Sequence, residues 1–151
     1  MLRIRRDLVD AMVAHARRDH PDEACGILAG PEDDDRPERV IEMLNAARSP
    51  TFYEFDSTEW NAVFLDMGRR DEKPVVIYHS HTATEPYPSR TDIAWADGYA
   101  KLEPSPHYIL IGTSDPEEHV LRSYRISEGE VTEEPVEVVA EYEPSAQSLP
   151  E

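Results

Sequence analysis

Apolar residues recur along the chain with two different spacings, and each spacing predicts a different kind of element. Within residues 6–19, the apolar positions from Leu8 to Ala16 repeat every three or four residues, as on the buried face of an amphipathic helix. We expect Asp7 to cap this helix and Pro21 to end it. The first element that the apolar pattern predicts is therefore a helix.

Shorter apolar runs bounded by glycine or proline predict strands. One is EACGILA, residues 23–29, which is closed by Gly30 and Pro31. The run VVIYHSH, which starts after Pro74, is apolar without alternation, as is typical of a central strand covered on both faces. The same reasoning predicts the remaining elements: strands over 39–46, 51–55 and 107–113, helices over 57–69 and 90–101, and a hairpin of 119–127 with 130–139.

The order of these elements predicts the fold class. Asp56 with Glu59 resembles a capping box, which supports a helix starting at residue 57 with Trp60, Phe64 and Met67 on one face. Helices and strands then alternate irregularly along the chain. We therefore expect an α+β fold, with a single mixed β-sheet packed by helices.

Composition narrows the class of protein. The 151 residues suffice for one domain, expected over 1–142, with an acidic, disordered tail over 143–151. The formal net charge of −17 repels phosphate backbones and anionic lipids, so nucleic-acid and membrane partners are not expected. The acidic run Glu32 to Asp35 is interpreted as a solvated loop. A single cysteine, Cys25, allows no internal disulfide, which favours the cytoplasm.

The end of the central strand carries the candidate chemistry. His79 and His81 are two residues apart, so on a strand both imidazoles point to one face, and Ser80 points away. Two rings that lean together can each place a nitrogen about 2.0–2.1 Å from one zinc ion. Asp92 lies eleven residues further on, far enough for the chain to turn back and supply a third ligand. Such a set leaves a fourth position for water.

Each half of this pattern also has a structural interpretation. Strands often carry histidines on a polar face, so the pair His79 and His81 alone is weak evidence for a metal. Ser89 with Asp92 alone is typical of a helix N-terminus, with Ser89 as the cap. The two halves at this spacing after a buried strand are more specific, and capping is compatible with ligation.

The spacing H-x-H-x7-S-x2-D, filled by His79, His81, Ser89 and Asp92, resembles the motif of the JAMM (JAB1/MPN/Mov34) metalloproteases. That family also places a glutamate upstream, and Glu23 in PDEACGILAG occupies the matching position. The stretch LNAARSPTFYEFD is similar to the middle strands of the family. The resemblance extends from the first helix to about residue 140 and implies an MPN fold, which is like that of cytidine deaminases.

The resemblance implies a role for each residue. His79, His81 and Asp92 would hold one zinc ion per chain, which lowers the pKa of a bound water from about 15.7 to about 7. Glu23 would accept the proton of this water and return it to the leaving amine. Ser89 would donate a hydrogen bond to the oxyanion, a contribution of about 3 kcal/mol.

Within the family, HSHTATEPYPSRTD with LRSYRI and VTEEPV most resembles the small bacterial branch. This implies cleavage of an amide after the C-terminal glycine of a ubiquitin-like sulfur carrier protein that ends in Gly-Gly, with release of cysteine. An isopeptidase for another ubiquitin-like modifier and a non-catalytic scaffold of the same fold are the alternatives. The complete motif disfavours the scaffold. A nucleoside deaminase would need a later P-C-x-x-C, which one cysteine excludes. The sequence leaves the oligomeric state open, a homodimer included.

Other polar residues are interpreted as structural. Cys25 lies two residues after Glu23 and is expected to be a buried core thiol rather than a ligand. His107 and His119 lie at expected strand starts. Tyr87, between two prolines, either lines the substrate groove or stiffens its loop.

Overall fold

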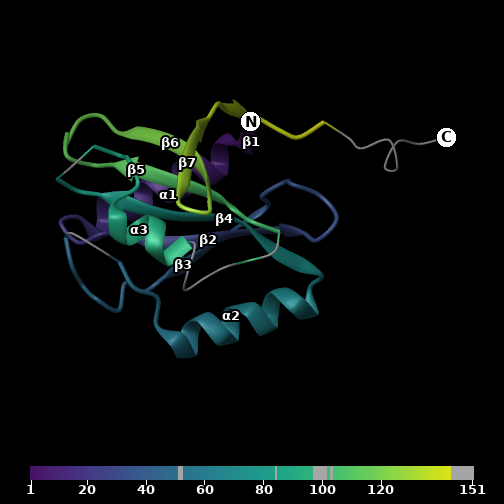
Figure 1. Cartoon of the computed structure of the whole chain (residues 1–151). Helices are drawn as coiled ribbons and strands as arrows, with labels where there is room; N and C mark the ends of the chain where they lie inside the picture. Colours follow the sequence, from purple (N-terminus) through teal and green to yellow (C-terminus); the bar gives the residue numbers. More distant parts are fainter. Residues whose placement is uncertain (51–52, 84, 97–101, 103, 144–151) are drawn as a thin grey trace.

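A computed structural model describes residues 1–50, 53–83, 85–96, 102 and 104–143. Its centre is a six-stranded mixed sheet (Figure 1). The strands of this sheet, in spatial order, are β3 (Arg39–Met43), β2 (Cys25–Pro31), β4 (Glu72–His81), β5 (His107–Gly112), β6 (Val120–Ser127) and β7 (Glu130–Glu134). Only β4 and β5 pair in parallel within it, and the other neighbours are antiparallel. The expected α+β class with a mixed central sheet is confirmed.

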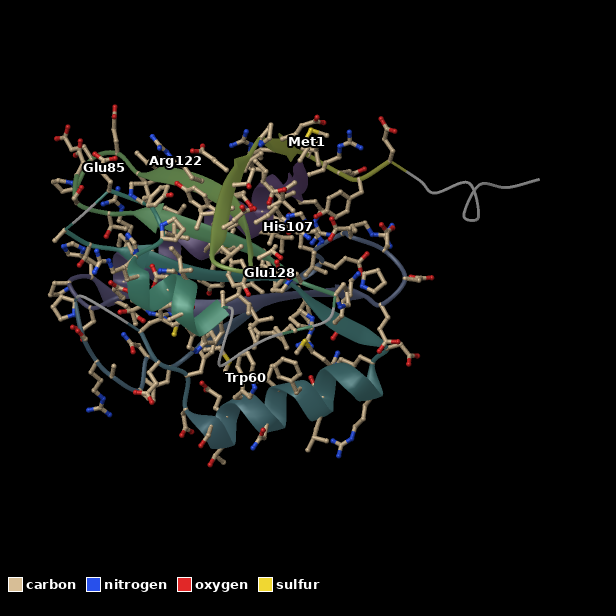
Figure 2. The ribbon with its side chains drawn as sticks, viewed as in Figure 1. Met1, Trp60, Glu85, His107, Arg122 and Glu128 are labelled. Atoms are coloured by element: carbon tan, nitrogen blue, oxygen red, sulfur yellow. The ribbon has the colours of Figure 1, made fainter. Side chains whose placement is uncertain are left out.

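Within the described residues, three helices accompany the sheet: α1 (Arg6–Asp19), α2 (Ser57–Arg69) and α3 (Arg90–Ala94). The apolar face of α1 packs with Leu28, Val76 and Tyr78 on one side of the sheet. On the other side, Met67 of α2 packs with Ile27. Figures 1 and 2 show α2 along this second face, with Trp60 between the helix and the strands. The strand β4 is thus covered on both faces, as its continuous apolar pattern predicted.

The glycine at the start of β2 has a packing function. A Cβ at Gly26 would collide with the ring of Tyr78 on the neighbouring β4. The space left by this glycine lets Tyr78 reach α1, where its hydroxyl lies 2.7 Å from Nδ1 of the buried His15. Gly26 therefore allows α1 to pack closely over β2, which follows Glu23, and over β4, which bears the two histidines.

The helix starts differ from the sequence expectation in detail. The N-cap of α1 is Arg5, without a side-chain cap, and Asp7 instead forms an ion pair with Arg5 at 2.9 Å. For α2 the predicted cap is confirmed, since Asp56 accepts a hydrogen bond from the Glu59 backbone. The reciprocal half of that capping box was wrong, because the Glu59 carboxylate accepts from the backbone of Leu44.

Two strand predictions were wrong. The expected strand over 51–55 forms no ladder in its described residues 53–55, where Phe55 makes one isolated bridge to Asn45. The second half of the expected hairpin divides at Pro135. Its first part is β7, and its second part is β8 (Val136–Val139), which pairs in parallel with β1 (Leu2–Arg5) in a separate two-stranded sheet.

The remaining boundaries are close to expectation. The expected helix over 90–101 corresponds to α3, and residues 97–101 lie outside the described residues, as do 144–151 of the expected tail. The division into a domain over 1–142 and a tail stays a prediction. None of the described helices has the length and apolar character needed to cross a membrane.

His107 joins three separate segments, in line with its structural interpretation. Its Nε2 lies 2.7 Å from Asp35 of the acidic loop, and its Nδ1 lies 2.6 Å from Glu134 at the end of β7. Two carboxylates around one imidazole require both nitrogens to donate, which only the imidazolium can do. Burial lowers the pKa of His107, but the hydrogen bonds to Asp35 and Glu134 outweigh it, and the net shift is upward.

This arrangement gives a pH-dependent contribution to stability. Because the pKa of His107 is raised by folding, its stabilisation is complete below about pH 6.5 and is lost as pH rises through the folded-state pKa. The pKa values of Asp35 and Glu134 are lowered, so their contribution disappears only in acid. We expect His107→Gln to reduce the free energy of unfolding most between about pH 5 and 6.5, and less at higher pH. Urea unfolding at several pH values measures this, and a deficit that grows toward pH 9 would contradict it.

Candidate metal and catalytic site

The two histidines converge at the carboxyl end of β4. Both are buried, at 2% and 5% exposure for His79 and His81, and their Nε2 atoms lie 3.1 Å apart. One oxygen of Asp92, Oδ2, lies 3.1 Å from each of these nitrogens. Three potential ligand atoms thus form a nearly equilateral triangle, as the i, i+2 spacing and the returning loop predicted.

The helix start that bears Asp92 fixes the position of this carboxylate. Ser89 caps α3, and its Oγ accepts a hydrogen bond from the Asp92 backbone at 3.1 Å. In return, Asp92 Oδ2 accepts from the Ser89 backbone at 2.9 Å. The Ser89 Oγ accepts in this contact, so its own proton can be donated to a second acceptor. Capping and the proposed site use the same residues.

Glu23 lies two residues before β2, the strand that pairs with β4. Its backbone N–H donates to Ser49 at 2.8 Å, and its carbonyl accepts from the Asn45 side chain at 3.0 Å. The side chain is 4% exposed, and its Oε1 has no hydrogen-bond partner within the described part of the chain. A carboxylate oxygen of Glu23 and a ring nitrogen of each of His79 and His81 all lie within 4.8 Å of one another. The structure therefore brings both acidic groups to the histidine pair.

Burial and neighbouring charges shift the pKa values of these groups. Burial raises the pKa of Glu23 to about 8. Burial acts in the same direction on Asp92, but the two histidines outweigh it and hold the pKa of Asp92 well below its ordinary range. Burial lowers the pKa of His79. Burial also lowers the pKa of His81, but the hydrogen bonds to Asp92 and to the Glu85 backbone outweigh it, and the net shift is upward. The two carboxyl groups thus differ: Asp92 is held ionised, and Glu23 is close to a proton-transfer range near neutrality.

The proton positions indicate that the triangle suits a cation. His81 Nδ1 lies 2.9 Å from the backbone carbonyl of Glu85, which only accepts, so Nδ1 carries the proton. The Nε2 of a neutral His81 then directs a lone pair at Asp92 Oδ2 and at His79 Nε2. A backbone carbonyl that fixes the imidazole tautomer in this way is typical of metal-ligating histidines. Atoms about 2.0–2.1 Å from a tetrahedral zinc lie about 3.3–3.4 Å apart, close to the separations here. The donor set fits zinc.

Three neighbours that the sequence analysis did not identify support the site. The ring of Tyr53 stacks on His79, with centroids 4.3 Å apart, and Trp95 packs against Tyr53. The Oδ1 atom of Asn45 accepts from the backbones of Ala47 and Glu54, each at 3.0 Å, which holds the amide that contacts Glu23. The contacts of Tyr53 with His79 and of Asn45 with Glu23 join segments distant in the sequence, so no local pattern predicts them.

The chain is similar to proteins of one known family. A family model described as prokaryotic homologs of the JAB domain matches residues 5–127. The chain belongs to this JAB-domain family. It is 66% identical over 142 residues to a CysO-cysteine peptidase of Mycobacterium tuberculosis, and the match covers 94% of each chain. It is 34% identical to a desampylase of Haloferax volcanii over 66% of this chain and 77% of the relative.

Solved structures support the JAB-domain fold. The crystal structure of AF2198, a JAB1/MPN domain protein from Archaeoglobus fulgidus, matches with a TM-score of 0.57 and 21% identity. The match covers 91% of this chain and 97% of that one. The expected JAMM family and its fold are therefore confirmed.

The other candidate residues of this JAB domain have structural surroundings. Cys25 is fully buried, with its Sγ 3.9 Å from the Met43 carbonyl, and burial raises the pKa of its thiol. It is a core thiol, as expected. Tyr87 is 54% exposed and packs edge-on against Tyr124. This contact fits the loop-stiffening interpretation of Tyr87, and the groove interpretation stays a prediction.

Proposed function

We propose that this JAB-domain chain is a zinc-dependent hydrolase that cleaves the amide after the C-terminal glycine of a ubiquitin-like sulfur carrier protein. Cysteine is the released product, the carrier ends in Gly-Gly, and the reaction takes place in the cytoplasm. The names of two relatives, the CysO-cysteine peptidase of M. tuberculosis and the desampylase of H. volcanii, support the hydrolase class and a ubiquitin-like protein substrate.

One observation carries the proposal: His79, His81 and Asp92 present three ligand atoms 3.1 Å from one another, with Glu23 buried alongside. This donor set supports a catalytic zinc site, in which the three side chains would be the protein ligands. Zinc in such a site supplies Lewis acidity, which makes water a nucleophile near neutral pH.

Glu23 and Ser89 have the remaining catalytic roles. Glu23 accepts a proton from the attacking water and donates one to the amine as the amide bond breaks. Because its buried Oε1 has no hydrogen-bond partner among the described residues, this oxygen is available for the transfer. Ser89, with its hydroxyl proton uncommitted to the cap, donates a hydrogen bond to the oxyanion. The products are a carrier that ends in a glycine carboxylate and free cysteine.

Substrate comparison tests the proposal. We expect the purified, zinc-loaded chain to release cysteine from a carrier protein that ends in Gly-Gly-Cys. The same tripeptide inside a folded loop of a control protein should stay intact, because a free extended tail can enter the site and a folded loop cannot. Mass spectrometry of both proteins measures the outcome. Equal cleavage of the two would indicate a general peptidase, and cleavage of neither would favour the scaffold alternative.

A further inference from the structure

A pocket of about 260 Å³ adjoins Glu23. Its walls are formed by Asp19, Asp22, Glu23, Leu44, Asn45 and Arg48. The wall includes the proposed proton donor but none of the residues His79, His81, Asp92 and Ser89. The carbonyl of the amide belongs with zinc and Ser89, and the amine belongs with Glu23. The pocket is therefore placed to receive the group attached to the amine.

The pocket wall contains acidic residues and one arginine. Asp19 is paired with His15 at 3.1 Å and with Arg18 at 3.3 Å, whereas the carboxylate of Asp22 leaves the wall acidic. Arg48, which is exposed, is the basic residue of the wall, and no ion pair to its guanidinium is found among the described residues. An acidic wall repels a substrate carboxylate, so one unpaired arginine there has a large influence on which substrates enter.

The backbone also holds Arg48 in an unusual conformation. Its φ is 46°, in the left-handed region that residues with a Cβ rarely adopt. Hydrogen bonds on both sides of the loop maintain it, from the Arg48 backbone to Asn45 at 3.0 Å and from Glu23 to Ser49 at 2.8 Å. The same loop thus fixes Arg48 and Glu23 relative to one another.

We infer that this pocket binds the C-terminal amino acid that is released, with Arg48 as the residue that recognises its α-carboxylate. The inference rests on the proposed function and deepens it. The amine formed at Glu23 lies among the acidic groups, the carboxylate pairs with Arg48, and the small side chain lies against Leu44, which is 54% exposed. Arg48 therefore makes the site selective for an amino acid that ends the chain.

The test compares two substrates and three variants. A carrier that ends in Gly-Gly-Cys is compared with one that ends in Gly-Gly-cysteinamide, which lacks the carboxylate charge. We expect the wild-type chain to favour the carboxylate substrate by about tenfold or more in kcat/KM, the usual effect of one charge-assisted hydrogen bond. Arg48→Gln should lose this preference by acting on the carboxylate substrate alone, and Arg48→Lys should retain part of it.

Arg122→Gln is the matched control, because it removes an exposed arginine of β6 (Figure 2) that is not part of the pocket wall. It should leave the preference unchanged. A second measurement avoids turnover: S-methyl-L-cysteine, whose thiol is blocked, should shift amide NMR signals of the pocket in the wild-type chain. In Arg48→Gln its affinity should fall about tenfold.

The outcomes separate the two proposals. Equal cleavage of both substrates by the wild-type chain, or an equal loss on both substrates in Arg48→Gln, overturns the role of Arg48 and leaves the hydrolase intact. Cleavage of neither substrate by the wild-type chain overturns the proposed function and this inference with it.

Discussion

Glu23→Gln is expected to lower kcat by at least about 10²- to 10⁴-fold while the chain keeps its zinc. Glutamine has the shape of glutamate but cannot accept and return a proton at neutral pH. Because His79, His81 and Asp92 supply the ligand triangle, zinc content should stay at about one ion per chain. Turnover of the carrier–cysteine conjugate and metal analysis of the same preparation measure both quantities.

The structure also predicts that this variant stays folded. Glu23 Oε1 is buried without a hydrogen-bond partner in the described part of the chain, so a neutral amide costs no contact of this atom. The backbone contacts of Glu23 to Ser49 and Asn45 do not involve the side chain of residue 23. The melting temperature should therefore be within a few degrees of the wild-type value.

Glu32→Gln is the control, since it removes a carboxylate from the exposed acidic loop and should change neither turnover nor zinc content. Two results would contradict the role of Glu23. One is turnover within about threefold of the wild-type value. The other is loss of zinc together with activity, which would make Glu23 a ligand.

The candidate site could be predicted because its geometry is local. The two-residue period of a strand places His79 and His81 on one face, and the capping box of Ser89 and Asp92 fixes the returning carboxylate. Both signals act within a few residues, so the sequence contains them in full. Glu23 was found only through its family motif, because its approach to the histidines depends on the pairing of β2 with β4.

The structural features that the sequence analysis did not predict depend on contacts between segments distant in the sequence. The strands β1 and β8 pair Leu2 with Val136, and nothing in either four-residue run indicates the other. Residues 51–55 have the aromatic composition of a strand, but Tyr53 and Phe55 are buried because they pack with Trp95 near His79. Aromatic content alone does not distinguish packing of this kind from a ladder.

His81→Ala is expected to reduce the zinc content from about one ion per chain to below about 0.1 and to abolish hydrolysis. The remaining pair, His79 and Asp92, is too few ligands for a structural or catalytic zinc site. The reason is geometric, because the Nε2 atom of His81 lies 3.1 Å from each of the other two ligand atoms and completes the triangle. Metal analysis after gentle purification measures the loss, and an exposed histidine replaced in His119→Ala serves as the control.

The alanine variant also removes the hydrogen bond from His81 to the Glu85 carbonyl, so a second variant separates metal binding from folding. Asp92→Asn keeps the size of the side chain and removes the charge that a zinc ion requires, and it too should lose the metal. Zinc at about 1,000 times its dissociation constant should stabilise the wild-type chain by about 4 kcal/mol, seen as a higher melting temperature, and should leave both variants unchanged. If either variant bound zinc as the wild-type chain does, the triangle of His79, His81 and Asp92 would not be the metal site.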